Sequence, residues 1–223
     1  MKIFCISIFL FFWLHSDSQT KKIADSTLEE MCKTLQTNPN NTLSDTDRIK
    51  DVFQKHITPL VSDLNETEQT DALQFVYFRL QRVCKEFKSI LDRIDTNKGD
   101  WVSVDQKPVS HLHKDEYKEM LKIGKFYYKE FSGDTVQLTL GNNIWEDHFK
   151  DGTYSRLKLR WLKDAEFQIE FIESNNLIRK NYSKPGDKYN YQLLEKKDNK
   201  YKLSAEVVGT GRFVTFYLYF EHK

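Results

Sequence analysis

The second half of the chain alternates apolar and polar residues along short runs, and this period of two constrains the fold more than any other feature. The clearest case runs from Arg156 to Ile172, where two such stretches meet at a short polar corner. The apolar side chains on one side of this run are Leu157, Leu159, Trp161, Phe167, Ile169 and Phe171. The other side carries Lys158, Arg160, Gln168 and Glu170. Because successive side chains of a strand point to opposite faces, the pattern predicts a hairpin with one buried face.

Eight or nine runs of this kind follow one another and are separated by turn-forming residues. They cover residues 101–105, 122–129, 135–140, 144–149, 154–161, 166–172, 189–195, 201–207 and 213–220. No helical pattern separates the strands, which argues against a parallel βαβ architecture. The pattern predicts an antiparallel meander over residues 96–223 that closes into a small barrel of about eight strands. A two-sheet sandwich is the alternative.

Residues 19–95 have a different period, because their apolar residues recur every three or four positions. Turn-forming residues around Pro39 separate a first helix near Ser26 from a second that begins near Ser44. The third and longest helix runs from about Leu73 to Ile94. The sequence therefore predicts an α+β fold, in which a three-helix module precedes the barrel.

Two cysteines, Cys32 and Cys84, fall on the apolar stripes of the first and third predicted helices. They can face each other there, and in an oxidising compartment such a pair forms a disulfide. In the chain-entropy model this crosslink contributes about 4 kcal/mol. A metal site is the weaker alternative because no pair of histidines lies nearby.

The first 18 residues have the pattern of a secretory signal peptide. One Lys precedes an apolar run from Ile3 to Leu14, and the small residues Ser16 and Ser18 follow. The run is shorter than the roughly 20 residues of a membrane-spanning helix. We therefore predict cleavage after Ser18 and a secreted or periplasmic protein without stable membrane insertion. An uncleaved anchoring helix is the alternative.

The charge balance argues against polyanionic partners recognised by bulk charge. The chain has 34 basic and 33 acidic residues, so we expect no nucleic-acid partner. Three N-x-S/T sequons lie at Asn40, Asn65 and Asn181. These sites would carry glycans only in a eukaryotic secretory pathway.

The β half resembles the lipocalins at two places. Gly99-Asp100-Trp101 matches the short G-x-W signature that opens the first lipocalin strand, and Arg212 lies where lipocalins place an Arg against that Trp. The resemblance implies a ligand-carrying barrel in which Trp101 closes the floor. The polar stretch from Gln106 to Glu119 is longer than the first connection of a lipocalin.

Residues 123–222 also resemble small exported bacterial β proteins of unknown function. Three segments carry this likeness: Gly124–Tyr128, Lys158–Trp161 and Asp164–Phe167. Ala165 stands where that pattern has Cys. The resemblance implies an envelope or secreted location and a small β fold, and it brings no catalytic residues.

Two clusters could carry chemistry. His111 and His113 could share a Zn²⁺ ion if they lay on one strand, although a polar loop of this kind is usually only solvated. Trp145-Glu146-Asp147-His148 places two carboxylates beside an imidazole, as acid–base catalysis would need. On a strand, however, Glu146 and His148 share one face and Asp147 takes the other. We therefore assign no catalytic residue, no metal ligand and no cofactor.

These patterns predict an exported binding protein that holds a small apolar ligand in the barrel or docks a partner protein. The predicted ligand-binding residues are Trp161, Phe167 and Phe171. One alternative is an extracellular or periplasmic hydrolase or isomerase acting at the barrel mouth. The other is a structural envelope component without a ligand.

Overall fold

The computed structural model describes residues 23–37, 42–95, 99–112, 115–130, 132–163, 165–208 and 210–221. The predicted signal peptide, the sequon at Asn40, and His113 and Asp164 lie outside the described residues. Cleavage after Ser18 and export therefore stay predictions. Within the described residues, no helix combines the length and the apolar composition that crossing a membrane requires.

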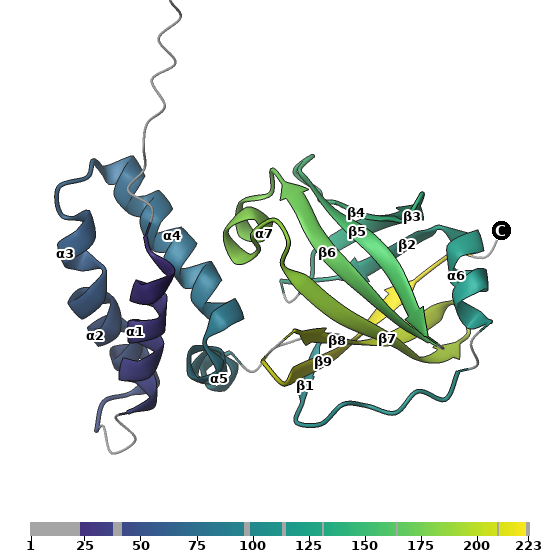
Figure 1. Ribbon diagram of the computed structural model, residues 1–223, viewed down its shortest axis with the longest axis horizontal. Helices are drawn as coiled ribbons and strands as arrows, with labels where there is room; N and C mark the ends of the chain where they lie inside the picture. Colours follow the sequence, from purple (N-terminus) through teal and green to yellow (C-terminus); the bar gives the residue numbers. More distant parts are fainter. Residues whose placement is uncertain are drawn as a thin grey trace, which may run out of the picture.

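The N-terminal part is helical, as the sequence predicts (Figure 1). Its helices are α1 (Asp25–Gln36), α2 (Asp45–His56), α3 (Thr58–Val61), α4 (Glu66–Val83) and α5 (Lys85–Ile94). They enclose a small core whose fully buried members include Met31, Ile57, Val76, Leu80 and Phe87. This core is separate from that of the barrel.

The third predicted helix is divided at Cys84 into α4 and α5. Cys84 has an extended backbone, with φ −116° and ψ 108°, so the helix cannot continue through it. Its sulfur accepts a hydrogen bond from the backbone N–H of Phe87 and so caps the start of α5. A second departure is α3, a single turn that directly follows α2. Apolar spacing alone did not reveal either break, because the buried stripe continues across both.

The predicted disulfide between Cys32 and Cys84 is present in the structure. It ties the middle of α1 to the junction of α4 and α5. The two residues are 52 positions apart, so the crosslink closes most of the helical part into one loop. Such a long loop restricts the unfolded chain strongly.

The C-terminal part is an antiparallel sheet that closes on itself, which confirms the predicted barrel over the sandwich. Its strands are β1 (Val102–Val104), β2 (Lys125–Lys129), β3 (Thr135–Gly141), β4 (Ile144–His148), β5 (Tyr154–Lys163), β6 (Glu166–Ser174), β7 (Lys188–Lys197), β8 (Lys200–Val207) and β9 (Arg212–Tyr219). Strands β2 to β9 form an eight-stranded barrel, and β1 is added at the edge of β9. The whole chain therefore has an α+β fold.

The predicted hairpin consists of β5 and β6, and its apolar face lies inside the barrel. Three inward-facing pairs join the two strands: Leu157 with Phe171, Leu159 with Ile169, and Trp161 with Phe167. All but Trp161 are buried, and Trp161 packs against the core at its edge. The hairpin therefore encloses the barrel core.

Each end of the barrel carries a helix that the sequence analysis did not predict (Figure 1). Helix α6 (Glu116–Ile123) lies at the end of the β3–β4 and β5–β6 turns, and it inserts Met120 into the core. Residue 122 therefore belongs to a helix and not, as expected, to the first long strand. Gly124 ends α6 with a φ of 70°, and a Cβ there would meet the carbonyl oxygen of Leu140 at 3.3 Å. Helix α7 (Leu177–Tyr182) lies at the opposite end, between β6 and β7.

Barrel closure is narrow between β2 and β9, where Tyr127 and Tyr219 form the single backbone pairing. Trp101 reinforces this seam, because its ring stacks on Phe216 with 4.4 Å between centroids. Its Nε1 also donates to the carbonyl oxygen of Lys129 at 2.5 Å. The lipocalin-like contact of Arg212 with Trp101 stays a prediction.

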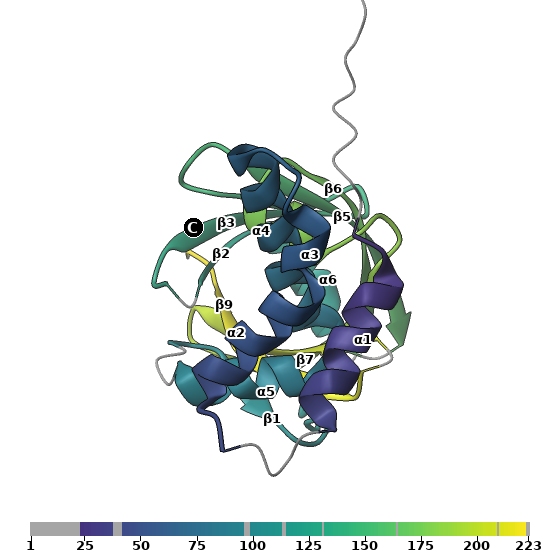
Figure 2. The ribbon, with the colours of Figure 1, turned by 90° about the vertical axis from the view of Figure 1, so that its left-hand side faces the viewer.

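The helical part lies against the α7 end of the barrel, and Figure 2 shows it in front of the strands. Helices α4 and α7 pack together there. Arg79 and Arg82 of α4 both reach Asp187 in the loop before β7, at 2.5 and 3.0 Å. Arg212 of β9 donates from Nη2 to the carbonyl oxygen of Arg82 at 2.9 Å. Helix α5 ends at Ile94 and β1 begins at Val102. The division into two domains and the independent folding of the two parts stay predictions.

Candidate functional site at the α7 end of the barrel

A cluster of polar side chains lies inside the barrel at the end covered by α7. Asp147 comes from β4, Tyr128 from the end of β2 and Tyr191 from the start of β7. Arg179 reaches the cluster from α7, and Glu130 from the turn that follows β2. Buried polar groups are costly unless they are paired, so such a cluster in an aromatic core indicates a specific role.

Asp147 is the centre of this cluster and is 5% exposed. Its Oδ1 accepts a hydrogen bond from Nε1 of Trp145 at 2.9 Å. Burial raises the pKa of Asp147 to about 7, although the positive charge of Arg179 and the Trp145 hydrogen bond act in the opposite direction. A carboxyl with this pKa can exchange a proton near neutral pH.

Arg179 provides the positive charge that acts most strongly on the Asp147 carboxyl. The start of α7 is held by Asn176, whose side chain accepts from the backbone N–H groups of Ile178 and Arg179. Nη2 of Arg179 donates to the Tyr128 hydroxyl at 3.3 Å and forms an ion pair with Glu130. Burial lowers the pKa of Arg179, but the charge of Glu130, with Tyr128 and Asp147, raises it well above its usual value. The guanidinium therefore stays charged.

Two tyrosines complete the cluster and keep their protons. Burial, followed by the nearby charge of Asp147, raises the pKa of both Tyr128 and Tyr191. Their hydroxyls are therefore hydrogen-bonding groups at neutral pH. The cluster thus contains the proton-exchanging carboxyl of Asp147, two neutral tyrosine hydroxyls, and the Arg179 cation with its ion-pair partner Glu130.

An open pocket of about 490 Å³ lies at the same end of the barrel. The β2–β3 turn, the β4–β5 turn and α7 form its walls, and they contribute Glu130, Asp134, Val136, Phe149, Ile178 and Arg179. Arg179 and Glu130 belong both to this lining and to the buried cluster. The ion pair between them therefore lies between the pocket and Asp147.

The structure separates the residues that the sequence grouped as Trp145-Glu146-Asp147-His148. Asp147 faces the interior, whereas Glu146 and His148 lie on the outer face, as the strand period predicts. His148 Nε2 lies 3.0 Å from Glu146, which also pairs with Arg156 at 2.8 Å. Asp147 and His148 therefore do not share a site, and the inward carboxyl finds its partners on other strands.

Of the predicted ligand residues, Phe167 and Phe171 belong to the barrel core, and the partly buried Trp161 packs against it. Phe167 is completely buried and contacts Trp161 and Tyr191, with ring centroids 4.7 and 5.3 Å apart. Trp161 and Phe167 lie towards the α6 end, and Phe171 lies closer to the α7 end. Ligand contact by these three residues stays a prediction.

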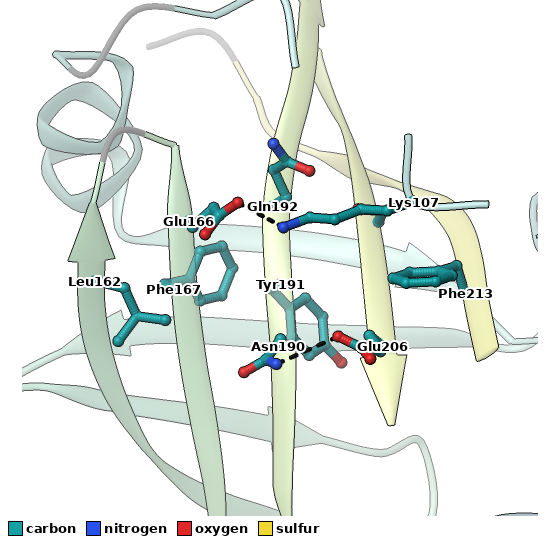
Figure 3. Close-up of a pocket in the computed structure, with 10 residues that line it drawn as sticks. Lys107, Leu162, Glu166, Phe167, Asn190, Tyr191, Gln192, Glu206 and Phe213 are labelled. Atoms are coloured by element: carbon teal, nitrogen blue, oxygen red, sulfur yellow. Dashed lines mark hydrogen bonds and ion pairs between the residues drawn. The ribbon is translucent and has the colours of Figure 1, made fainter. Parts of the chain in front are cut away.

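A second pocket borders this region, on the outer side of β6, β7 and β8 (Figure 3). Its volume is about 70 Å³, well below the roughly 300 Å³ at which small-molecule sites begin. Lys107 crosses it to Glu166 at 2.6 Å, and Asn190 donates to Glu206 at 3.3 Å. These four polar side chains thus pair with one another, whereas the buried Oε1 of Gln192 has no hydrogen-bond partner in the described structure.

Sequence analysis missed Arg179, Glu130 and Tyr128. The Asn176 cap before Leu177 is the one local signal that could have revealed α7. Only the closed barrel places these residues around Asp147, because they lie on three separate elements. Pairings of this kind are not encoded in local spacing.

The remaining predicted sites lie outside the cluster. His111 is exposed and its backbone N–H donates to Leu194. No group of three or more metal-binding side chains occurs among the described residues. Asn65 is exposed at the start of α4, where its side chain accepts from the backbone N–H of Glu68. Asn181 is half-buried on α7.

The fold and this cluster define an α+β protein with a disulfide-linked helical part and a polar site at one end of a barrel. No protein-family model matches the chain, and no curated protein is significantly similar to it.

Proposed function

We propose that this chain is an exported binding protein whose small ligand occupies the pocket beside α7. The single observation that carries the proposal is the volume of that pocket, about 490 Å³, which lies within the range of known small-molecule sites. The barrel interior, in contrast, is filled by large side chains such as Phe167, Tyr201 and Phe216. We therefore propose that the ligand binds at the mouth of the barrel and not at the β5–β6 hairpin.

The pocket offers apolar surface for a ligand body, and Arg179 can receive an anionic end, although the carboxylates of Glu130, Asp134 and Asp151 also line it. Phe149 and Ile178 offer apolar surface in the lining of the pocket. Arg179 stays charged at one edge, and its guanidinium carbon lies 5.5 Å from the centre of the Phe149 ring. An anionic group can share the Arg179 guanidinium with Glu130, because that group has several N–H donors.

A fluorescent fatty acid, dansylamino-undecanoate, tests this proposal in a direct titration. We expect saturation below about 100 μM, which corresponds to roughly 5.5 kcal/mol of binding free energy. Arg179→Gln should weaken binding at least tenfold. Arg160→Gln removes the same charge from the outer face of β5, where Arg160 donates to Gln168, and should leave binding unchanged. Equal loss in both variants, or no saturation by wild-type protein, would count against the site.

A second candidate function is acid–base catalysis, and the pKa of about 7 at Asp147 favours it. In this role the Asp147 carboxylate takes a proton from carbon and returns it to a neighbouring carbon, as an isomerase does. Arg179 and Tyr128 separate Asp147 from the pocket, so the proton would pass through the Tyr128 hydroxyl or the two side chains would move aside.

Deuterium exchange into small ketones in D₂O, followed by NMR, tests the catalytic alternative. An isomerase of this kind accelerates exchange at carbon next to the carbonyl, and Asp147→Asn abolishes the acceleration. Asp71→Asn serves as the control, because Asp71 is exposed on α4 and is not among the residues that line the pocket. Binding of the fatty acid without any deuterium exchange would support ligand binding and contradict catalysis.

A further inference from the structure

The outer surface of β8, β9 and β2 carries a face of tyrosines and lysines that is separate from the pocket. Tyr217 and Tyr219 point outward from β9, because Phe216 and Leu218 between them are buried. The same alternation turns Lys200 and Lys202 outward on β8, and Tyr127 and Lys129 outward on β2. These six residues are called the Tyr–Lys face below.

The side chains of this face are held close together. Lys200 Nζ lies 4.2 Å from the centre of the Tyr217 ring and 5.7 Å from that of Tyr219. Lys202 Nζ lies 6.0 Å from the Tyr217 ring. Tyr127 and Tyr219 stack on each other at 5.2 Å. Two ammonium groups thus share one aromatic ring, although like charges repel each other.

The positive charge of this face is not neutralised within the described part of the chain. Lys129, Lys200 and Lys202 form no ion pair there, whereas Lys107, Lys184 and Lys196 each pair with a carboxylate. Asp100 lies at the edge and accepts a hydrogen bond from the Tyr219 hydroxyl at 2.9 Å. Glu221 follows two residues after Tyr219 and is exposed. On β7, Glu195 lies opposite Lys202 and Lys197 lies opposite Lys200. With these two neighbours counted, four lysines still exceed the three carboxylates.

From this excess of charge we infer that the Tyr–Lys face binds an acidic polysaccharide, a chain with sulfate or uronate groups. The ammonium groups match the anions, and the tyrosine hydroxyls can bond to sugar hydroxyls. A linear polyanion can follow the convex outer surface of a barrel, whereas a flat bilayer touches few lysines at once. The tyrosine rings are also half-buried and pack against one another and Lys200, which leaves little aromatic surface to insert into a membrane.

The test uses the full-length mature protein with heparin decasaccharide and with oligogalacturonate as probes. We expect one of the two to bind in 50 mM salt, and binding should weaken steeply as salt rises because the contacts are ionic. The double variant Lys200→Gln/Lys202→Gln should weaken binding at least tenfold. The double variant Lys158→Gln/Lys163→Gln is the matched control, because β5 lies four strands away from β9 in either direction around the barrel.

Three other results would overturn the inference. Equal loss of binding in the control variant would mean that only the total charge of the protein matters. Absence of binding to both glycans would exclude acidic polysaccharides as the ligand of this face. Vesicles with 30% phosphatidylserine provide a third arm. Binding to these vesicles that depends on Lys200 and Lys202, without glycan binding, would assign the face to lipid. Amide spectra of each variant show whether the fold is intact, and the pocket titration with the fatty acid is independent of this face.

Discussion

Nη1 of Arg79 lies 2.5 Å from Oδ2 of Asp187, and this ion pair joins the helical part of the chain to the barrel. The same carboxylate oxygen lies 3.0 Å from Nε of Arg82. Both arginines are buried, so Asp187 is the counter-charge that allows two cations to lie in this interface.

Asp187→Asn should therefore destabilise the protein by about 3 kcal/mol, since it leaves two buried cations without a counter-charge. Urea unfolding measures this loss. Asp25→Asn breaks an exposed ion pair with Lys184 and should cost less than about 1 kcal/mol. A similar small effect in both variants would show that the two parts are not held together through Asp187.

Removal of the disulfide should weaken the helical part more than the barrel. The double variant Cys32→Ser/Cys84→Ser loses about 4 kcal/mol in the chain-entropy model, and its serine at the buried position 84 adds a further loss. Hydrogen exchange resolves the two parts, and we expect faster exchange of the α1, α4 and α5 amides. Thiol labelling of denatured, unreduced wild-type protein checks the premise, because two reactive thiols per mature chain would contradict the disulfide.

Asp147 should make stability depend on pH between about 4 and 7. The pKa rises from its ordinary 3.8 in the unfolded chain to about 7 in the folded one, so the folded state holds a proton that the unfolded state has lost. Stability is then greatest below the unfolded pKa, falls as pH rises and levels off above pH 7. Burial of an ionised carboxyl is thus a cost to the fold, as is common at functional sites.

Asp147→Asn removes this dependence. The difference in unfolding free energy between variant and wild type should shift by on the order of 3 kcal/mol in favour of the variant from pH 5 to pH 8. Comparing two pH values cancels any packing effect of the amide itself. Hydrogen bonds from the hydroxyl and the backbone N–H of Thr153 keep the pKa of Asp151 below its ordinary value, so Asp151→Asn should show the same difference at both pH values. A flat profile for Asp147→Asn would mean that the carboxyl is ionised throughout.

The barrel and the disulfide were predictable because they depend on local patterns. The pair Leu159 and Ile169 follows from alternation along β5 and β6, and the pair Cys32 and Cys84 follows from helical spacing and an even cysteine count. Alternation also placed Asp147 on the face opposite to Glu146 and His148. In each case one or two short stretches of sequence contain all the information that the prediction needs.

The helices at the barrel ends and the site itself were not predictable in this way. Helix α6 is only eight residues long, and the polar residues around it concealed its buried Met120. Arg179 and Asp147 are separated by a complete strand pair, and only the closed barrel brings their charges together. A buried charge pair needs both partners, so neither residue alone identifies the site.

Arg179→Gln should raise the pKa of Asp147 above about 7, because Arg179 is the strongest group that favours the ionised carboxylate. A nearby opposite charge lowers a carboxyl pKa by about 1–3 units, so we expect a rise of at least about one unit. Carbon-13 NMR of the Asp147 carboxyl follows the titration directly. Arg156→Gln removes a charge of the same sign from the outer face, where Arg156 pairs with Glu146 and Glu173, and should leave that titration in place. If Arg179→Gln leaves the midpoint of the Asp147 titration unchanged, the charge of Arg179 is not coupled to the buried carboxyl. A ligand bound at Arg179 could then not influence Asp147.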